Sequence, residues 1–322
     1  MQGSTIQEGT ICYKNRRKFG IQGFLFAIIP LCGFIFFCLF PIAYSIFLSF
    51  TDLSSSTQLI GNVDVVINFV GFENYLNVFN DMRFWHSVAV AFYVTLGQFM
   101  SLTVALSMSA LLSSKVKGWN LFSVLYFIPY ICSSVAMAMI WQKMFDYQRG
   151  IINELLISFG AITAETKINW VNEADVYMVI FLFVTAWHAP GYGIIMYNAA
   201  FSAIDSTLYE AAKIDGASRI KQFTSITMPS ISHTTYFLVM LGFISGLQQF
   251  EIFQVFTGLG GSWTGQFGPN DMGLVPLLYI YYIKDTNMGS SSAMSWFMFF
   301  IVFSVSKLNE RFQHVWVANE NE

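Results

Sequence analysis

The side chains best suited to bind a ligand are amides and hydroxyls in an apolar stretch near residue 245. Gly242, Ser245, Gln248 and Gln249 fall within an arc of about 100° on a helix that advances ~100° per residue. Side-chain amides donate and accept hydrogen bonds together, which suits vicinal hydroxyl groups. Glu251 follows near the end of this stretch and is interpreted as a charge that reaches water. The polar stripe predicts a ligand pathway, with packing between helices as the alternative.

A second group of candidate ligand-binding residues is Trp187, His188 and Tyr192. Pro190 lies among them, frees a backbone carbonyl and predicts a kink. Aromatic faces stack on the apolar faces of sugar rings, and polar edges bind their hydroxyls. The alternative is core packing, because 18% of the chain is aromatic.

No set of residues indicates catalysis or a metal site. The histidines are dispersed, at His86, His188, His233 and His314. The sequence contains no His-Glu-x-x-His pattern, no Gly-x-Ser-x-Gly elbow and no phosphate-binding Gly-x-x-x-x-Gly-Lys loop. We therefore expect no enzyme activity, no metal and no ATP hydrolysis by this chain. A polytopic membrane enzyme and a secondary transporter are kept as alternatives.

Residues 205–229 are the long polar interruption in the second half of the chain. They predict two short helices around Gly216, where a left-handed residue would end the first. Asp205 or Ser206 is expected to cap the first helix and Ser218 the second. Pro229 is expected to stop the second helix.

This loop carries small and charged residues that suit docking into a groove on a partner. Glu210-Ala211-Ala212, Gly216, Ile226 and Pro229 match the spacing of a known signature, and Met228 stands where leucine is usual. The signature resembles that of permease subunits of bacterial ABC importers, and the longer run from Glu210 to Ala217 resembles their sugar-importing, maltose and glycerol-phosphate branch. The resemblance implies a loop that couples to an ATPase through these residues: Glu210, Ala211, Ala212, Asp215, Gly216, Ile226 and Pro229.

The resemblance also implies roles and partners. Gln248 and Gln249 lie where the family's sugar-binding amides occur, and Tyr192 aligns with a position that lines the sugar site. Residues 71–75 resemble the segment that follows the first span. The implied partners are a second permease, an extracellular solute-binding protein and two ATPase subunits that bind ATP and magnesium, with no cofactor in this chain and no nucleic acid.

The elements that must position these residues are membrane helices. The chain of 322 residues is 55% hydrophobic and 11% charged, where soluble domains carry about 25% charged residues. This composition predicts an all-α, polytopic protein with the importer permease fold that the resemblance implies. The expected spans are residues 19–50, 84–112, 119–145, 175–201, 234–257 and 288–306. Residues 274–283 are too short to span and predict an outward half helix. Pro30 and Pro41 predict kinks in the first span.

Basic residues predict the orientation of these spans. Eleven of the 16 Lys and Arg residues fall on the side of the 205–229 loop, and the other five fall on the opposite side. This bias places the loop and both termini in the cytoplasm of a bacterial cell. The expected organisation is a tail at 1–18, a membrane domain at 19–308 that contains a coupling loop at 202–232, and a tail at 309–322.

Overall fold

The structure, a computed structural model, describes residues 24–54, 67–113, 119–258 and 269–316. These residues are mostly helical, and the β-structure among them is one isolated bridge between Thr51 and Phe69. The predicted tail at 1–18, the residues around Lys115 and Lys117, and the glycine-rich loop after residue 258 fall mainly or wholly outside the described residues.

The helices follow one another along the described residues. Those in the first half are η1 (Ile35–Leu39), α2 (Phe40–Ser49), α4 (Glu73–Asn80), α5 (Met82–Ser113), α6 (Trp119–Ile131), α7 (Ser134–Met144) and α8 (Ile151–Ser158). Those in the second half are α9 (Ala174–His188), α10 (Pro190–Ala203), α11 (Ser206–Ile214), α12 (Arg219–Gln222), η2 (Phe223–Thr227), α13 (Met228–Ser230), α14 (Ser232–Leu247), α15 (Glu251–Gly258), η3 (Pro269–Asp271), α16 (Pro276–Lys284) and α17 (Met288–Trp316).

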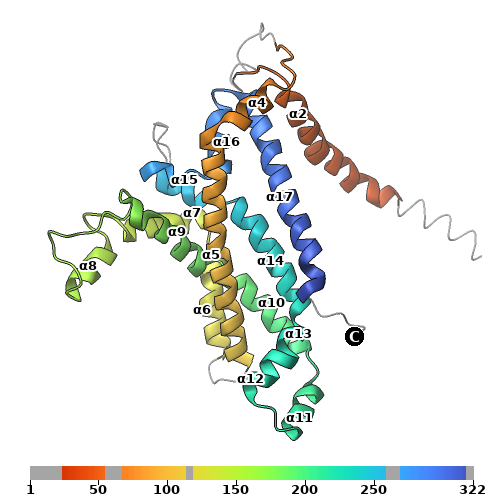
Figure 1. Cartoon of the computed structure of the whole chain (residues 1–322), viewed down its shortest axis with the longest axis vertical. Coiled ribbons are helices and arrows are strands. Elements are labelled where there is room, and N and C mark those ends of the chain that lie inside the picture. The colour runs from red at the N-terminus through yellow and green to blue at the C-terminus, as the bar shows by residue number, and fades with distance from the viewer. Residues whose placement is uncertain (1–23, 55–66, 114–118, 259–268, 317–322) are drawn as a thin grey trace, which may run out of the picture.

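Helix α5 is the axis of the bundle. Its 32 residues extend over about 48 Å, and it packs against α9, α10 and α14 (Figure 1). Gly246 permits the close approach of α14, because a Cβ atom there would lie 2.5 Å from Thr95 Oγ1 of α5. Gly242 and Gly246 form a Gly-x-x-x-Gly pattern, which permits this kind of close contact between helices.

In the part of the chain that the structure describes, five helices are long and apolar enough to cross a membrane: Phe24–Ser49, Met82–Leu111, Val176–Ala203, Ser232–Thr257 and Met288–Gln313. A sixth crossing depends on α6 and α7, which meet at an angle of 100°. The span predicted over 119–145 is thus divided into two helices that meet at a sharp bend. Ser133 has a non-helical backbone, with φ −57° and ψ 129°, and it starts α7 in a new direction.

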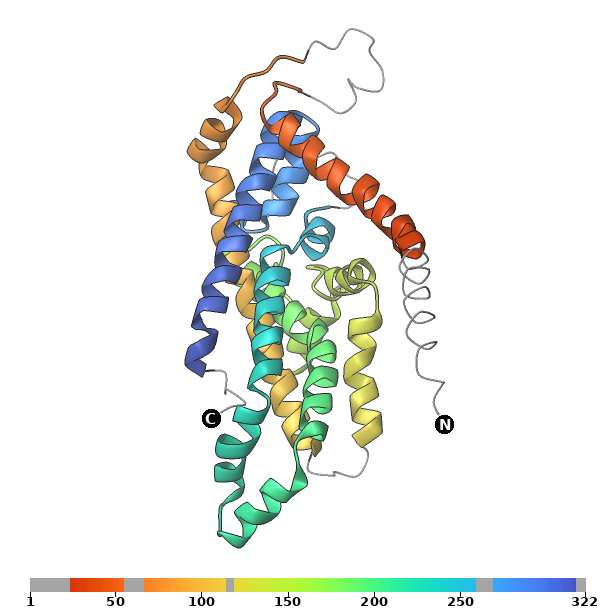
Figure 2. The ribbon, with the colours of Figure 1, turned by 90° about the vertical axis from the view of Figure 1, so that its right-hand side faces the viewer.

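The first helix stands apart from the bundle and contacts α17 through α2 (Figure 2). None of the residues in its most apolar stretch is buried against the rest of this chain. Pro41 is preceded by the π-helical segment η1, in which Phe40 N–H donates to the carbonyl of Ile35. The wider turn accommodates proline, which has no N–H and would clash with the preceding turn of an α-helix.

A buried asparagine anchors the end of this first helix. Asn74 of α4 donates to the backbone carbonyls of Ser49 and Thr51, at 2.9 and 2.8 Å, and accepts from the Ser290 hydroxyl of α17. Asn74 belongs to the 71–75 segment that the sequence singled out. Its hydrogen bonds join the start of α17 to the end of α2.

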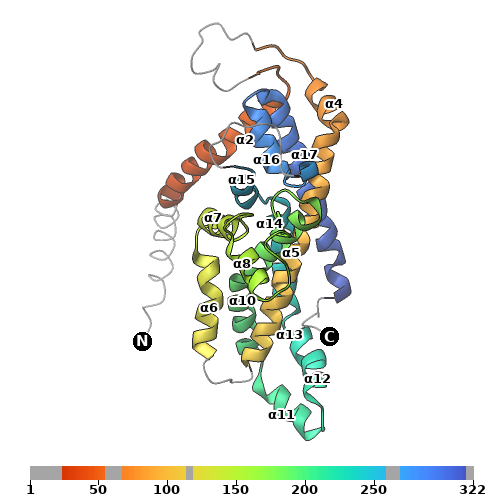
Figure 3. The same ribbon diagram turned by 90° about the vertical axis from the view of Figure 1, so that its left-hand side faces the viewer.

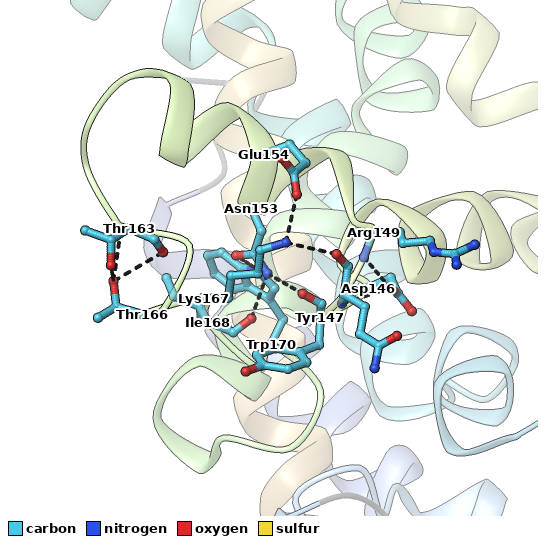
Figure 4. A network of polar contacts seen from close by, with 11 residues as sticks. Asp146, Tyr147, Arg149, Asn153, Glu154, Thr163, Thr166, Lys167, Ile168 and Trp170 are labelled. Carbon is cyan, nitrogen blue, oxygen red and sulfur yellow. Dashed lines mark hydrogen bonds and ion pairs between the residues drawn. The ribbon is translucent and has the colours of Figure 1, made fainter.

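The predicted half helix at 274–283 is confirmed as α16, which packs against α17 and α5 at the end of the molecule opposite α11 (Figure 1). The 146–173 loop contains α8 and is organised around buried Asn153, whose amide nitrogen donates to the carbonyls of Tyr147 and Ile168 (Figure 4). Trp170 Nε1 donates to the Asn153 side-chain oxygen at 3.0 Å. This loop is therefore an ordered cap and not an irregular connection.

Two hydrophobic clusters hold the bundle together. The larger joins α5, α7, α9, α15, α16 and α17, and in it Phe181 stacks on Phe253 at 4.0 Å between ring centroids. The smaller lies nearer the coupling loop and joins α5, α10 and α14 around Tyr197 and Leu238. The breaks in the helices lie between these two cores.

Candidate functional site

Three interrupted helical segments surround one polar cavity. It has a volume of about 370 Å³ and lies where α6 turns into α7, where α9 ends and where α14 gives way to α15. The lining residues come from all three places: Ser134, His188, Ser245, Gln248, Gln249, Phe250, Glu251 and Ile252. The cavity thus brings together four of the residues that the sequence predicted to bind substrate.

The two glutamines lie at the break that follows α14. Gln248 closes the last turn through its backbone N–H, which donates to Ile244 O at 3.2 Å. Among the described residues, neither the Gln248 nor the Gln249 side-chain amide has a hydrogen-bond partner. Ser245 donates to the carbonyl of Leu241 at 2.8 Å, so its oxygen is left to accept. These groups offer both donors and acceptors to a polar ligand.

Glu251 is a cavity residue whose role the sequence did not establish. It is the first residue of α15, where the helix dipole favours a carboxylate, and it accepts a hydrogen bond from the Ser134 hydroxyl of α7. Packing between α7 and α15 and a second bond, from Gln142 Nε2 to Val255 O at 3.1 Å, hold this pair of helices together. Ser134 carried no sequence signal, because its relation to Glu251 depends on the bend between α6 and α7.

His188 lines the same cavity from α9. It hydrogen-bonds the backbone of Cys132 and lies within electrostatic reach of Glu251. Its Nε2 atom is buried and has no hydrogen-bond partner among the described residues. The imidazole is therefore held at the bend between α6 and α7 and does not extend a free nitrogen into the cavity.

The other two predicted aromatic residues lie outside the cavity lining. Trp187 packs edge-on against Trp141 with 5.2 Å between ring centroids, and Tyr192 packs in a tilted arrangement against Tyr130 with 5.9 Å between centroids. Both contacts correspond to the packing alternative, and in this conformation neither ring borders the cavity. Their predicted roles in substrate binding remain predictions.

A larger hollow of about 630 Å³ runs along α7 to the start of α8, and its lining includes Met139, Ile140 and Ile151. Most of its exposed lining is apolar, although the charged residues Lys143, Asp146 and Arg149 also border it. We therefore place the candidate binding site in the smaller cavity, where amide, hydroxyl and carboxylate groups converge.

The coupling loop projects beyond the ends of the other helices (Figure 3). Asp205 caps α11 by accepting from Thr207 N–H at 2.9 Å, and Ser218 caps α12. Both predicted caps are present. The Thr207 N–H bond lowers the pKa of the Asp205 carboxyl, because it favours the ionised form.

Gly216 ends α11 in a left-handed conformation with φ +73°, as predicted. The N–H of Gly216 donates to Lys213 O, and the N–H of Ala217 donates to Ala212 O. This pair of bonds is the Schellman arrangement, which satisfies the last carbonyls of a helix. Tyr209 closes the loop through a 2.7 Å bond between its hydroxyl and that of Thr227.

Pro229 does not stop the second helix, and that prediction was wrong. The π-helical segment η2 precedes it, with Met228 N–H donating to Phe223 O, and the chain continues through α13 into α14. The wide turn removes the conflict between proline and the preceding carbonyl, as at Pro41. The coupling loop is consequently joined to α14 by an almost uninterrupted helical path.

The predicted coupling residues lie on the surface of this loop. Glu210, Ala211, Asp215 and Gly216 are exposed, while Ala212 and Ile226 are partly buried. Large apolar side chains accompany them, since Ile214 is 88% exposed and Ile220 77% exposed. An exposed apolar patch on a charged, ordered loop is typical of a protein interface.

Broken apolar helices around a polar cavity, with an ordered loop projecting at one end, define a membrane transport subunit. The chain belongs to the family described as "Binding-protein-dependent transport system inner membrane component", whose model matches residues 101–315. The protein is therefore a multi-pass membrane component of a binding-protein-dependent ABC transporter and is not itself an enzyme.

Curated relatives match most of this chain, and two of them match nearly its full length. The chain is 29% identical to the "Probable ABC transporter permease protein YesP" of Bacillus subtilis (strain 168), covering 96% of each chain. It is 29% identical to the "Lactose transport system permease protein LacF" of Rhizobium radiobacter, covering 95% of this chain and 97% of the relative. It is 30% identical to the "Trehalose/maltose transport system permease protein MalF" of Thermococcus litoralis, over 73% and 77% of the two chains.

A solved structure shares the fold. It is described as "a bacterial ABC transporter involved in the import of the acidic polysaccharide alginate", and it matches with a TM-score of 0.69 and 18% identity, over 95% of this chain and 98% of that chain. The same importer permease fold thus accommodates a sequence that differs at most positions.

Proposed function

We propose that this chain is one of two permease subunits of an importer that carries a sugar or oligosaccharide across a bacterial cytoplasmic membrane. The cavity at the helix breaks carries this proposal, because glutamine amides without a hydrogen-bond partner among the described residues converge there with a serine hydroxyl, inside otherwise apolar spans. The names of the lactose and trehalose/maltose relatives support a saccharide as the substrate.

In the proposed cycle, an extracellular binding protein delivers the substrate, and two ATPase subunits bind ATP and magnesium in the cytoplasm. With α6 and α7 counted together as one crossing, the chain would cross the membrane six times, and both termini and the coupling loop would lie on the cytoplasmic side. The distribution of basic residues supports this orientation. The loop enters a groove on one ATPase, with Glu210 and Asp215 offering charge and Ile214 and Ile220 offering apolar contact. Closure of the ATPases then moves α14 through the continuous helical path, which alternates access to the cavity.

The coupling role is tested by co-purification from membranes with the neighbouring gene products. Glu210→Lys should insert and fold normally but lose most of the bound ATPase, because the charge of the docking surface is reversed. Glu165→Lys is the matched control, since it reverses an exposed acid in the 146–173 loop. Equal ATPase recovery from native protein and Glu210→Lys, with normal uptake, would contradict the docking role.

The cavity role is tested by uptake. The double variant Gln248→Ala/Gln249→Ala should assemble with its partners but lose at least about tenfold in uptake, because each lost hydrogen bond removes roughly 1 kcal/mol of binding. The matched control is Gln142→Ala, an amide that binds the carbonyl of Val255 and does not line the cavity. If the uptake rate of the double variant depends on saccharide concentration as in the native protein, the two amides do not bind the substrate and serve helix packing instead.

A further inference from the structure

The charge of the candidate cavity points to the class of saccharide that it accepts. Its lining contains two titratable side chains among the described residues, Glu251 and His188. The remaining polar groups are neutral amides and hydroxyls. Glu251 therefore sets the sign of the charge that a bound solute meets.

Several contacts keep the Glu251 carboxylate at the cavity. It starts α15, where the unpaired backbone N–H groups favour negative charge, and Ser134 donates a hydrogen bond to it across the two helices. Its side chain remains exposed to the cavity. A carboxylate has several acceptor positions, so the bond from Ser134 leaves others to a ligand hydroxyl or ammonium group.

Basic groups close to the cavity do not offset this charge. His188 buries its Nε2 atom without a hydrogen-bond partner among the described residues, and this burial disfavours a charged imidazolium ring. On the packed helices, Lys143 of α7 lines the larger apolar hollow, and Lys167 pairs with Glu154 in the 146–173 loop. An anionic group in the cavity would face Glu251 without a described cation beside it.

We infer that the cavity selects neutral or amino-bearing saccharides and rejects acidic ones, through repulsion between Glu251 and a substrate carboxylate or phosphate. This inference rests on the proposed sugar-binding function. It distinguishes the chain from its structural neighbour, whose description names an acidic polysaccharide. Proteins that share this fold can accept substrates of different charge, because single side chains in the binding site select that charge.

The test uses the purified importer complex without its binding protein, so that the cavity and not the delivery protein is measured. Isothermal titration at low ionic strength compares three matched β-1,4-linked disaccharides: cellobiose, its uronic acid counterpart cellobiouronate, and the amine-bearing chitobiose. Wild-type protein should bind cellobiouronate at least about tenfold more weakly than cellobiose, and chitobiose at least as tightly as cellobiose. The penalty for the uronate should fall to within about twofold in Glu251→Gln.

Glu154→Gln is the matched control, because it also removes one carboxylate but lies in the 146–173 loop away from the cavity. It should keep the wild-type penalty. Equal binding of cellobiose and cellobiouronate by wild-type protein, or an unchanged penalty in Glu251→Gln, would overturn the charge selection while leaving a sugar cavity. Failure of all three probes to bind wild-type protein and Glu251→Gln would instead count against the sugar-binding function and everything built on it.

Discussion

Single residues in the coupling loop determine whether it keeps the shape that a partner could recognise. Gly216 combines φ +73° with open space where a Cβ atom would lie, so a substitution there acts through the backbone alone. Asp205 holds the other end of α11 by its side chain. Both residues could be identified from sequence, because caps and left-handed helix ends depend on a few neighbouring residues.

Gly216→Val should destabilise the end of α11 by about 1–2 kcal/mol, because a β-branched residue resists the left-handed conformation. Hydrogen exchange of residues 206–217 in the assembled complex should accelerate, and bound ATPase should decrease. Gly160→Val is the matched control, since Gly160 has φ +72° and equally open surroundings in the 146–173 loop. If both variants retain the same amount of ATPase, the shape of the coupling loop does not matter for docking.

Asp205 should make the stability of α11 depend on acid pH. Its folded-state pKa lies below the ordinary value of 3.8, so its stabilising bond to Thr207 is present above that value and is lost as the pH falls through the folded-state pKa. Hydrogen exchange of α11, corrected for intrinsic rates between pH 2.5 and about 6, should show this loss in the native chain. Asp205→Asn keeps a capping oxygen without titrating, so a persisting pH dependence in that variant would exclude the cap as the cause.

At the scale of helices, the sequence predicted the positions of the apolar segments better than their directions. The half helix α16 followed from the length of its apolar segment. The bend between α6 and α7 did not, because it depends on packing of α7 against α15, and the pairing of Ser134 with Glu251 joins residues 117 positions apart. The prediction that Pro229 would stop its helix failed because a π-helical turn precedes the proline and accommodates it.

The close contact between α14 and α5 predicts a sharp difference between two glycines on one helix. Gly246→Ala should destabilise the protein by about 1–3 kcal/mol, because its Cβ would lie 2.5 Å from Thr95 Oγ1. Gly242→Ala should be nearly neutral, since its Cβ would meet Leu102 at an ordinary 3.6 Å. Thermal unfolding in detergent measures both variants, and a melting temperature for Gly246→Ala equal to that of Gly242→Ala would contradict the close packing.

The whole molecule has an uneven surface that a membrane and partner subunits must complete. The helix Phe24–Ser49 leans away from the bundle, and its apolar side chains are exposed (Figure 2). The other single helices that could cross a membrane each bury a third or more of their most apolar stretch. The coupling loop extends at one end, and α16 caps the other (Figure 1). This polarity agrees with the distribution of basic residues, which predicts opposite sides of the membrane for the coupling loop and the 146–173 loop.

Cysteine labelling tests that orientation. After replacement of Cys12, Cys32, Cys38 and Cys132, Lys213→Cys places one exposed thiol on α11, and Glu165→Cys places one in the 146–173 loop. A membrane-impermeant maleimide added to intact cells stripped of any outer barrier should label Glu165→Cys and leave Lys213→Cys unlabelled, because the positive-inside rule keeps the coupling loop in the cytoplasm. Permeabilised cells provide the control, in which both thiols should react. Labelling of Lys213→Cys in intact cells, with Glu165→Cys protected, would invert the membrane topology and separate the coupling loop from any cytoplasmic ATPase.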